Sequence, residues 1–435
     1  MSNALKGLLW LIIAVVVLAG GYALYTLLRP TGAEPAAPIA GAPAGITDKL
    51  ARGEYLARAA DCVACHTAPG GTPYAGGFAF KLPFGTIYGT NITADKETGI
   101  GNWSYAAFER AMRHGVDRQG RYLYPAFPYT AFTRTSDDDL QALYAYLMSQ
   151  PPVNYRPPVT DLHFPFNIRQ GIFAWNLLFL TPGAMQENPA QSAAWNRGAY
   201  LAEGLGHCSA CHSPRNVLFG EKTGGDHLAG GVAEGWTAPA LTGRSPAPLD
   251  WTQQDLVDFM RTGYSANHGV AAGPMAPVIE EGLSRLPQAD LQAIAVYLRS
   301  YHPETAAGAT AATLNAKAER QVEPLSSQGA RLFSGACMAC HAQEKGAQMA
   351  GVRPSLALNT NLFAEAPDNA IRVVLDGIQR PANAELGYMP GFRHNLDDAQ
   401  IAILLNYLRQ HYAGQAPWPD LTAQVSRLRA ETAQK

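Results

Sequence analysis

The sequence lacks the features by which several large protein classes are recognised. It contains no G-x-G-x-x-G and no P-loop motif, so no dinucleotide-binding or nucleotide-binding domain is indicated. Its formal net charge is −2 and only 16% of its 435 residues are charged, which leaves no basic footprint for a nucleic-acid partner. Cysteine is scarce as well, with six residues in a chain long enough for about three domains.

All six cysteines fall in Cys-x-x-Cys-His motifs, at Cys62–His66, Cys208–His212 and Cys337–His341. This spacing is typical of the attachment site of a c-type haem, in which both cysteines form thioether bonds and the histidine binds the iron. A zinc ribbon usually takes its four ligands from two Cys-x-x-Cys segments, so that three such segments would leave one unpaired. A redox dithiol of the thioredoxin kind would be expected near a βαβ pattern, which does not surround any of the motifs. Structural disulfides would leave the repeated histidine without a purpose. We therefore expect three covalently bound haem c groups, attached through Cys62, Cys65, Cys208, Cys211, Cys337 and Cys340, with His66, His212 and His341 as iron ligands.

The same order of segments surrounds each motif and predicts three copies of one small domain. A helix containing a glycine precedes each motif, and an apolar helix with a Tyr-Leu pair closes each copy, at Tyr146-Leu147, Tyr297-Leu298 and Tyr407-Leu408. The glycine would let the closing helix cross the first one closely. The expected fold class is mostly α, with three tandem class I-like cytochrome c domains: domain 1 over 46–150, domain 2 over 191–302 and domain 3 over 327–413.

The segments between and after these domains are assigned separately. Residues 151–190 and 303–326 are expected to be linkers. The C-terminal tail, 414–435, is expected to form an amphipathic helix with Leu421, Val425 and Leu428 on one face, either capping domain 3 or docking a partner.

The N-terminus is expected to attach the chain to a membrane. Residues 7–28 form an uninterrupted apolar run, about the length that a helix needs to cross a bilayer. A cleaved signal peptide is the alternative, although its apolar core is usually only about 7–15 residues long. We expect an anchor over 1–30 and a Pro/Ala tether over 31–45. Since bacteria attach c-type haem outside the cytoplasmic membrane, the expected location is the inner membrane, with the haem domains in the periplasm.

A constant interval between corresponding positions of the domains predicts the second axial ligand of two haems. An interval of 15 residues leads from Met260 to Met275 in domain 2, and the same interval leads from Val374 to Met389 in domain 3. Both methionines lie in a loop before the closing helix, and a thioether is a stable ligand for low-spin haem iron. In domain 1 the same interval leads from Met112 to Phe127, where no ligand is present.

The second ligand of the first haem is therefore open. Met112 is the nearest replacement, but a core role suits it equally well, because its counterpart Met260 coexists with a loop methionine. The other candidates are His114, Met148 and an open or water-bound iron. An open iron would allow a haem enzyme of the peroxidase or reductase kind.

The chain resembles the triheme cytochrome c subunits of bacterial membrane-bound dehydrogenases in its three haem motifs and in the stretches YGTNITADKETGIGNW, LYPAFPY, FPFNIR and GHCSACHSPRN. The resemblance implies axial roles for Met275 and Met389. It also implies that a separate dehydrogenase oxidises the substrate, so that no substrate catalysis is expected from this chain alone.

The resemblance further implies the electron path and the kind of partner. Electrons would cross the haems to ubiquinone or a terminal oxidase. Partners in this family are quinoprotein (PQQ) alcohol dehydrogenases, flavin-dependent sugar dehydrogenases, and molybdenum aldehyde dehydrogenases with an iron–sulfur subunit. A Phe at 127 combined with Met112 is more similar to the molybdenum aldehyde dehydrogenase branch.

Overall fold

The computed structural model describes residues 3–28, 46–302, 308–320, 327–341 and 351–432. The chain divides into a short N-terminal unit, Met1–Pro38, and a large unit, Ile39–Lys435. Helix α1 (Asn3–Leu28) belongs to the short unit. Within the described residues no helix combines the length and apolarity needed to cross a membrane, so the anchor expected over 1–30 is not supported. The tether expected over 31–45 lies outside the described residues.

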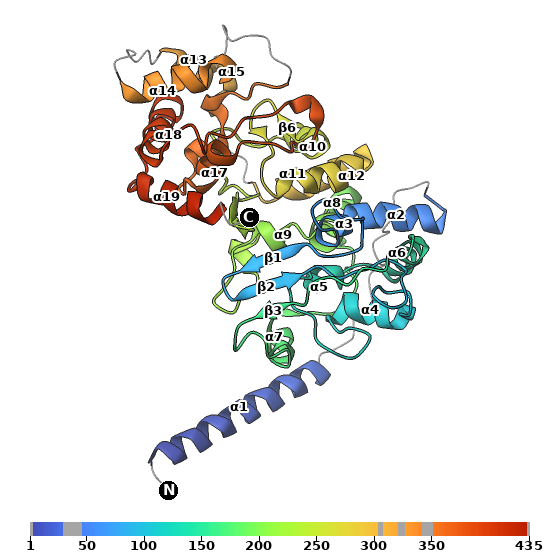
Figure 1. The fold of residues 1–435 in the computed structure, drawn as a ribbon. Helices are drawn as coiled ribbons and strands as arrows, with labels where there is room; N and C mark the ends of the chain where they lie inside the picture. The colour runs from blue at the N-terminus through green and yellow to red at the C-terminus, as the bar shows by residue number, and fades with distance from the viewer. Residues whose placement is uncertain (1–2, 29–45, 303–307, 321–326, 342–350, 433–435) are drawn as a thin grey trace. The chain divides into compact units, whose positions relative to one another are not determined.

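Domain 1 begins with a capped helix and contains a small antiparallel sheet. The side chain of Asp48 accepts a hydrogen bond of 2.8 Å from the Ala51 N–H at the start of α2. Strands β1, β2 and β3 lie side by side in that order (Figure 1). The elements are α2 (Lys49–Ala59), α3 (Cys62–Cys65), β1 (Ala79–Leu82), β2 (Gly85–Tyr88), α4 (Tyr105–His114), α5 (Tyr129–Phe132), α6 (Asp137–Ser149) and, from the linker, β3 (Asp161–Leu162).

Domain 2 repeats the helix order, with two short hairpins in place of the sheet. Its first helix continues into a single π-helical turn just before the second haem motif. The elements are α8 (Ala193–Tyr200), η1 (Leu201–Leu205), α9 (Ser209–His212), η2 (Gly224–Asp226), β4 (Gly231–Ala233), β5 (Trp236–Ala238), α10 (Gln253–Thr262), β6 (Tyr264–Ser265), β7 (Gly269–Val270), α11 (Met275–Pro277), η3 (Val278–Gly282), η4 (Leu283–Arg285) and α12 (Gln288–Arg299).

Domain 3 is built from helices, as expected, and the tail closes over it. Leu421, Val425 and Leu428 are buried and belong to the same apolar core as α17 and α18, so the predicted amphipathic tail helix caps this domain. The elements are α13 (Ala311–Arg320), α14 (Gln328–Ala336), α15 (Met338–His341), η5 (Leu356–Leu358), α16 (Thr360–Phe363), α17 (Asp368–Asp376), η6 (Ala384–Leu386), α18 (Asp398–Ala413) and α19 (Leu421–Thr432).

The first and last helices of each domain cross closely at the predicted glycine. A Cβ atom added at Gly53 in α2 would lie 2.2 Å from the carbonyl oxygen of Ala142 in α6, where no side chain could fit. The same crossing recurs in the other two domains, with Gly198 at 2.0 Å from the Ala293 oxygen and Gly329 at 2.5 Å from the Tyr407 Cβ. These crossings give the cytochrome c fold, in which about half of the chain is helical.

The buried apolar side chains form a pattern that three separate domains would not give. Those of domains 1 and 2 make one continuous core, which runs from Leu56 and Leu143 to Leu201 and Leu291. Domain 3 has a core of its own, and a small third cluster joins its Ala382 to Ala271, Ala276 and Ile279 of domain 2.

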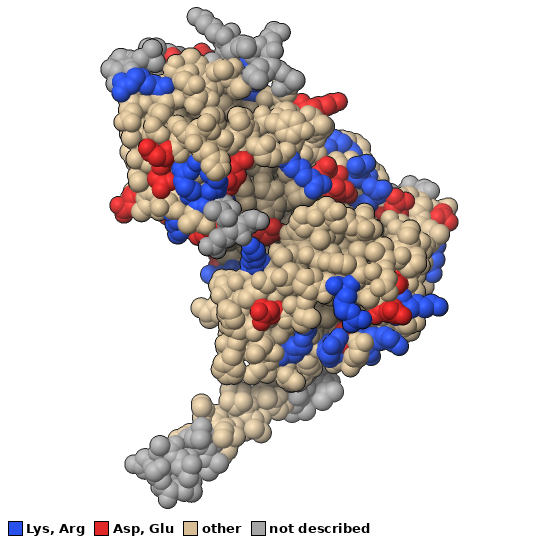
Figure 2. Space-filling view, viewed as in Figure 1, with Lys and Arg blue, Asp and Glu red and all other residues tan. Residues whose placement is uncertain are grey.

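The linker between domains 1 and 2 contains one helix, which lies at the surface of the large unit. Helix α7 (Gly171–Phe179) has no buried residue. On the face shown in Figure 2, basic and acidic side chains are interspersed over the described residues, in keeping with the net charge of −2.

Candidate haem sites

Each Cys-x-x-Cys-His motif forms one helical turn. The backbone N–H of the histidine bonds to the carbonyl oxygen of the first cysteine, at 3.1 Å for His66, 2.9 Å for His212 and 2.9 Å for His341. Residues three and four apart lie on the same face of such a turn, so both thiols and the imidazole of a motif share one face. All six cysteines are partly exposed, and Cys62, Cys65, Cys208, Cys211 and Cys337 form no disulfide.

Backbone carbonyl groups orient two of the three imidazole rings. Nδ1 of His66 lies 2.6 Å from the Thr90 carbonyl oxygen, and Nδ1 of His212 lies 2.7 Å from that of Pro239. A carbonyl oxygen only accepts hydrogen bonds, so Nδ1 carries the proton and Nε2 is left to bind a metal. In domain 3 the Pro354 carbonyl faces His341, but Nδ1 of that ring forms no hydrogen bond of ordinary geometry.

Burial keeps these imidazoles neutral. It lowers the pKa of His66, His212 and His341, while the facing carbonyl groups act in the opposite direction. A neutral imidazole is the form that binds a metal.

Burial also raises the pKa of the thiols of Cys62, Cys65, Cys208, Cys211 and Cys337 and keeps them protonated. It raises the pKa of Cys62 and Cys208 to about 12, and that of Cys211 and Cys337 to about 11. Thiols of high pKa are poor nucleophiles and poor ligands for a bare metal ion. Among the described residues, no group of three or more His, Cys, Asp or Glu side chains is placed to hold such an ion. These residues therefore fit a haem, which needs two unpaired thiols beside an imidazole with a free Nε2.

The two methionines predicted as axial ligands both precede the closing helix of their domain. Met275 is the first residue of α11 and is partly buried against the cluster that contains Ala276 and Ile279. Met389 forms an isolated antiparallel bridge with Ile378, through backbone hydrogen bonds of 2.9 and 3.3 Å. Their roles as axial ligands remain predictions.

Met112 occupies the same structural position in domain 1 as Met260 in domain 2. Both are 5% exposed, on α4 and α10, and both belong to the shared core. Phe127 packs against Phe132, with ring centroids 5.4 Å apart. Of the other candidates, Met148 is partly buried and His114 is exposed at the end of α4. The choice of Met112 as a ligand remains a prediction.

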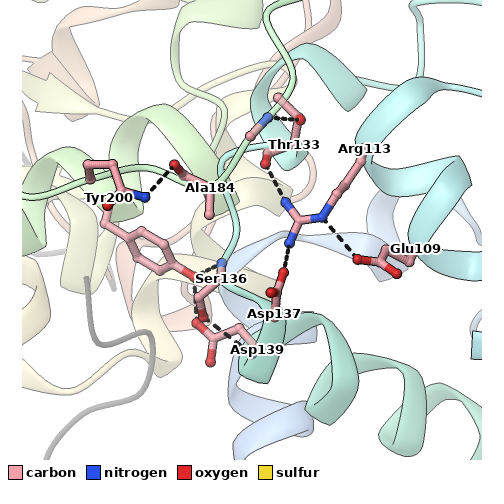
Figure 3. Close-up of polar contacts among 10 residues, drawn as sticks. Glu109, Arg113, Thr133, Ser136, Asp137, Asp139, Ala184 and Tyr200 are labelled. Atoms are coloured by element: carbon pink, nitrogen blue, oxygen red, sulfur yellow. Dashed lines mark hydrogen bonds and ion pairs between the residues drawn. The ribbon is translucent and has the colours of Figure 1, made fainter. Parts of the chain in front are cut away.

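A set of buried polar residues between domains 1 and 2 was not predicted from the sequence. The acidic run at 137–139 suggests a favourable charge at a helix N-terminus. In the structure Asp139 is fully buried and accepts a hydrogen bond of 2.5 Å from the hydroxyl group of Tyr200 in domain 2 (Figure 3). No spacing in the sequence signals this contact, since 61 residues separate the two side chains.

The helix crossings and the haem motifs define a protein of the cytochrome c class. In agreement, the cytochrome c family model matches residues 50–151 and 326–411. The chain is 37% identical to the fructose dehydrogenase cytochrome subunit of Gluconobacter japonicus, over 92% of this chain and 84% of the relative. It is 39% identical to the gluconate 2-dehydrogenase cytochrome c subunit of Pantoea cypripedii, over 87% and 89%. The chain belongs to the family of cytochrome c subunits of bacterial dehydrogenase complexes, which implies covalently bound haem c.

A further relative is much longer than this chain. A subunit of the nicotinate dehydrogenase of Pseudomonas putida is 51% identical over 88% of this chain, but the matched part is only 32% of that relative. The chain thus spans about a third of the length of that protein.

Proposed function

We propose that this chain is a triheme c-type cytochrome, which takes electrons from a separate dehydrogenase and passes them to ubiquinone or a terminal oxidase. The observation that carries the proposal is the repetition of one geometry: each of three one-turn helices presents two cysteine side chains and a neutral imidazole on the same face. Haem supplies one-electron redox chemistry when it is bound.

The residues of the chain hold and orient the groups around each haem. Thr90 and Pro239 fix the rings of His66 and His212 through their carbonyl oxygens, which leaves Nε2 for the iron. Met275 and Met389 are proposed as the opposite ligands, and a thioether in that position raises the reduction potential of the haem. Mass spectrometry of peptides from the full-length chain tests the haem count, with one haem expected on each motif.

The partner is proposed to be a dehydrogenase of the molybdenum and iron–sulfur type. The combination of Phe127 and Met112 supports this branch over the PQQ and flavin types. The 51% identity to the nicotinate dehydrogenase subunit, against 37% and 39% for the fructose and gluconate subunits, makes a nicotinate-type enzyme the first to test. Co-purification followed by molybdenum, PQQ and flavin analysis distinguishes the three types.

We also propose that the haem domains lie in the periplasm, attached to the inner membrane by residues 1–30. This proposal rests on the apolar run at 7–28 and on the compartment in which bacteria attach c-type haem. Fractionation of cells that express the whole chain or a chain without residues 1–30 tests it. If the haem-stained chain leaves the membrane fraction only after the deletion, the attachment is as proposed.

The second candidate function is a haem enzyme that uses an open iron in domain 1, and Phe127 is the observation in its favour. The spin state and CO binding of the chain, compared with those of a Met112→Ala variant, separate the two candidates. A wild-type chain with low-spin haems only, and a variant that gains one high-spin haem, would make Met112 the ligand. High-spin haem in the wild-type chain would instead favour the enzyme.

A further inference from the structure

Domains 1 and 2 are joined by two reciprocal sets of buried polar contacts. The hydroxyl group of Tyr55 in domain 1 donates to the carboxylate of Asp290 in domain 2, at 2.7 Å. In return, the hydroxyl group of Tyr200 in domain 2 donates to the carboxylate of Asp139 in domain 1, at 2.5 Å (Figure 3). All four side chains are buried, with exposed fractions between 0 and 6%.

Each carboxylate is paired with an arginine of its own domain. Arg52 donates to Asp139 at 2.7 Å, and Arg197 donates to Asp290 at 2.8 Å. Arg197 also reaches across to the hydroxyl group of Tyr55, at 2.8 Å. A buried carboxylate is costly unless its charge is paired and its remaining lone pairs accept hydrogen bonds. In both sets, the tyrosine of the other domain donates one of the hydrogen bonds that the buried carboxylate needs.

Residues at corresponding positions of domains 1 and 2 form both sets of polar contacts. Each arginine directly precedes the crossing glycine of the first helix, each tyrosine follows that glycine by two residues, and each aspartate is the third residue of the last helix. Such an exchange of equivalent contacts is the pattern of a two-fold interface between identical subunits. In domain 3 the three corresponding positions hold Gln328, Arg331 and Gln400, so this pattern belongs to domains 1 and 2 alone.

The haem motifs lie against the same interface. The first motif helix, α3, packs against η3 of domain 2, and η1, which directly precedes the second motif, packs against α2 and α5 of domain 1. A Cβ atom added at Gly282 in η3 would lie 2.9 Å from the Arg58 carbonyl oxygen. The ring of His207, next to Cys208, meets that of Phe132 edge to face, with centroids 5.5 Å apart.

Domain 3 is attached in a different way. Asn369 of α17 exchanges two hydrogen bonds, of 2.9 and 2.8 Å, with the backbone of Thr237 in strand β5. Arg372 donates to the carbonyl oxygen of Gly235 in the same hairpin, at 2.9 Å. Domain 3 also contacts η3 of domain 2, where Arg380 donates to Glu280 at 2.9 Å and to Glu281 at 3.0 Å. Ala382 packs in a small apolar cluster with Ala271, Ala276 and Ile279 of domain 2. None of these contacts repeats the reciprocal pattern that joins domains 1 and 2.

We propose that domains 1 and 2 form a single two-haem unit, in which Tyr55 and Tyr200 are positioning residues for electron transfer between the first two haems. The inference rests on the proposed function, because it requires a haem on each of the two motifs. The continuous core brings the motifs together, and the directional hydrogen bonds of the two tyrosines fix their relative placement. Domain 3 is then a second redox unit with a core of its own, joined to domain 2 through the β4–β5 hairpin, the Arg380 ion pairs and the Ala382 cluster.

The test uses the full-length holoprotein with the substitutions Tyr55→Phe and Tyr200→Phe, alone and together. Each removes one hydroxyl group that binds a buried carboxylate, and hydrogen exchange of the α2 and α8 amides is expected to accelerate about tenfold in each single variant. The rate of electron equilibration between haems 1 and 2, measured after pulsed reduction, is expected to fall in each single variant and further in the double variant. The rate to the third haem from the first two should change less.

The matched control is Tyr144→Phe, which removes a hydroxyl-to-carbonyl hydrogen bond of 2.7 Å to Trp103 inside domain 1. It should leave the equilibration between haems 1 and 2 unchanged. The inference is overturned if the double variant equilibrates at the wild-type rate, or if the control slows it equally. If the double variant does not fold, Asp139→Asn, which keeps an acceptor for Tyr200, should equilibrate faster than Asp139→Ala, and equal rates would overturn the inference.

This outcome is distinct from a failure of the proposed function. If mass analysis finds no haem on one of the two motifs, the triheme proposal fails before any rate is measured. If all haems are present and the rates do not respond, only the two-haem unit is rejected.

Discussion

Nδ1 of His212 lies 2.7 Å from the carbonyl oxygen of Pro239, which directly follows strand β5. This contact assigns the Nδ1 proton and leaves Nε2 as the ring nitrogen that would bind iron under the proposed function. The second haem site is therefore held by the hairpin that also contacts domain 3 through Thr237 and Asn369. The orientation of the ligand and part of the attachment of domain 3 therefore depend on the same short hairpin, Gly231–Ala238, and on the residue that follows it.

Replacement of His212 by alanine should leave the second haem attached but change its spin state. The thioether bonds to Cys208 and Cys211 do not involve the imidazole, so the haem count should be unchanged while one low-spin spectrum is lost. Added imidazole should restore that spectrum. His227→Ala is the control, because Nε2 of His227 bonds to Glu203 at 2.8 Å and not to the motif. An unchanged spin state in His212→Ala would refute the ligand assignment.

Met275→Ala and Met260→Ala should behave differently, although the two residues lie in one domain. The loop variant is expected to gain a high-spin haem and to lose the high potential that a thioether ligand gives. The helix variant should stay low-spin but lose about 2–5 kcal/mol of unfolding free energy, because it leaves a cavity in the core. Redox titration and chemical denaturation measure the two effects. A low-spin Met275→Ala variant with unchanged potential would contradict the prediction.

Gly198→Ala should destabilise domain 2, although alanine favours a helix over glycine by about 1 kcal/mol. The new Cβ atom would lie 2.0 Å from the Ala293 carbonyl oxygen, so α8 and α12 must move apart. Overpacking of this kind costs about 1–3 kcal/mol or more. Gly225→Ala is the matched control, since a Cβ there meets nothing within 4 Å. Equal denaturation midpoints for the two variants would show that the crossing is not tight.

His268 should make the stability of domain 2 depend on pH. Burial lowers the pKa of this side chain to about 4, against the opposing charge of Asp255, and its ring stacks on Trp251 with centroids 3.7 Å apart. In the unfolded chain the pKa is about 6.5. Because the folded form has the lower pKa, the stabilising contribution is present above about pH 6.5 and is lost as the pH falls towards 4.

His268→Phe tests this dependence, because it keeps an aromatic ring on Trp251 and removes the titration. The variant should lose less stability between pH 6.5 and 4 than the wild-type chain does, by up to one proton in the slope of unfolding free energy against pH. His114→Phe, at an exposed position, serves as the control. The same slope in the wild-type chain and in His268→Phe would rule out a contribution from His268.

Features that depend on local chemistry or on the repeats were predictable from the amino-acid sequence. Cysteine and histidine at i, i+3 and i+4 share one face of a single turn whatever surrounds them, so the haem motifs were predictable. The crossing glycines were predictable as well, because a close approach of two helices excludes every other residue. The apolar spacing of Leu421, Val425 and Leu428 likewise predicted the tail helix, although only the structure shows that it caps domain 3.

How the copies combine is visible only in the folded chain. The repeat predicted three equivalent domains, but domains 1 and 2 share a core. Tyr55 and Tyr200 each donate a hydrogen bond to a buried carboxylate of the other domain. Contacts between residues far apart in the chain leave no period in the sequence, because each partner taken alone resembles an ordinary helix residue. Asp139 illustrates this: at the start of a helix it suggests a surface charge, and only the docked domain 2 makes it a fully buried acceptor.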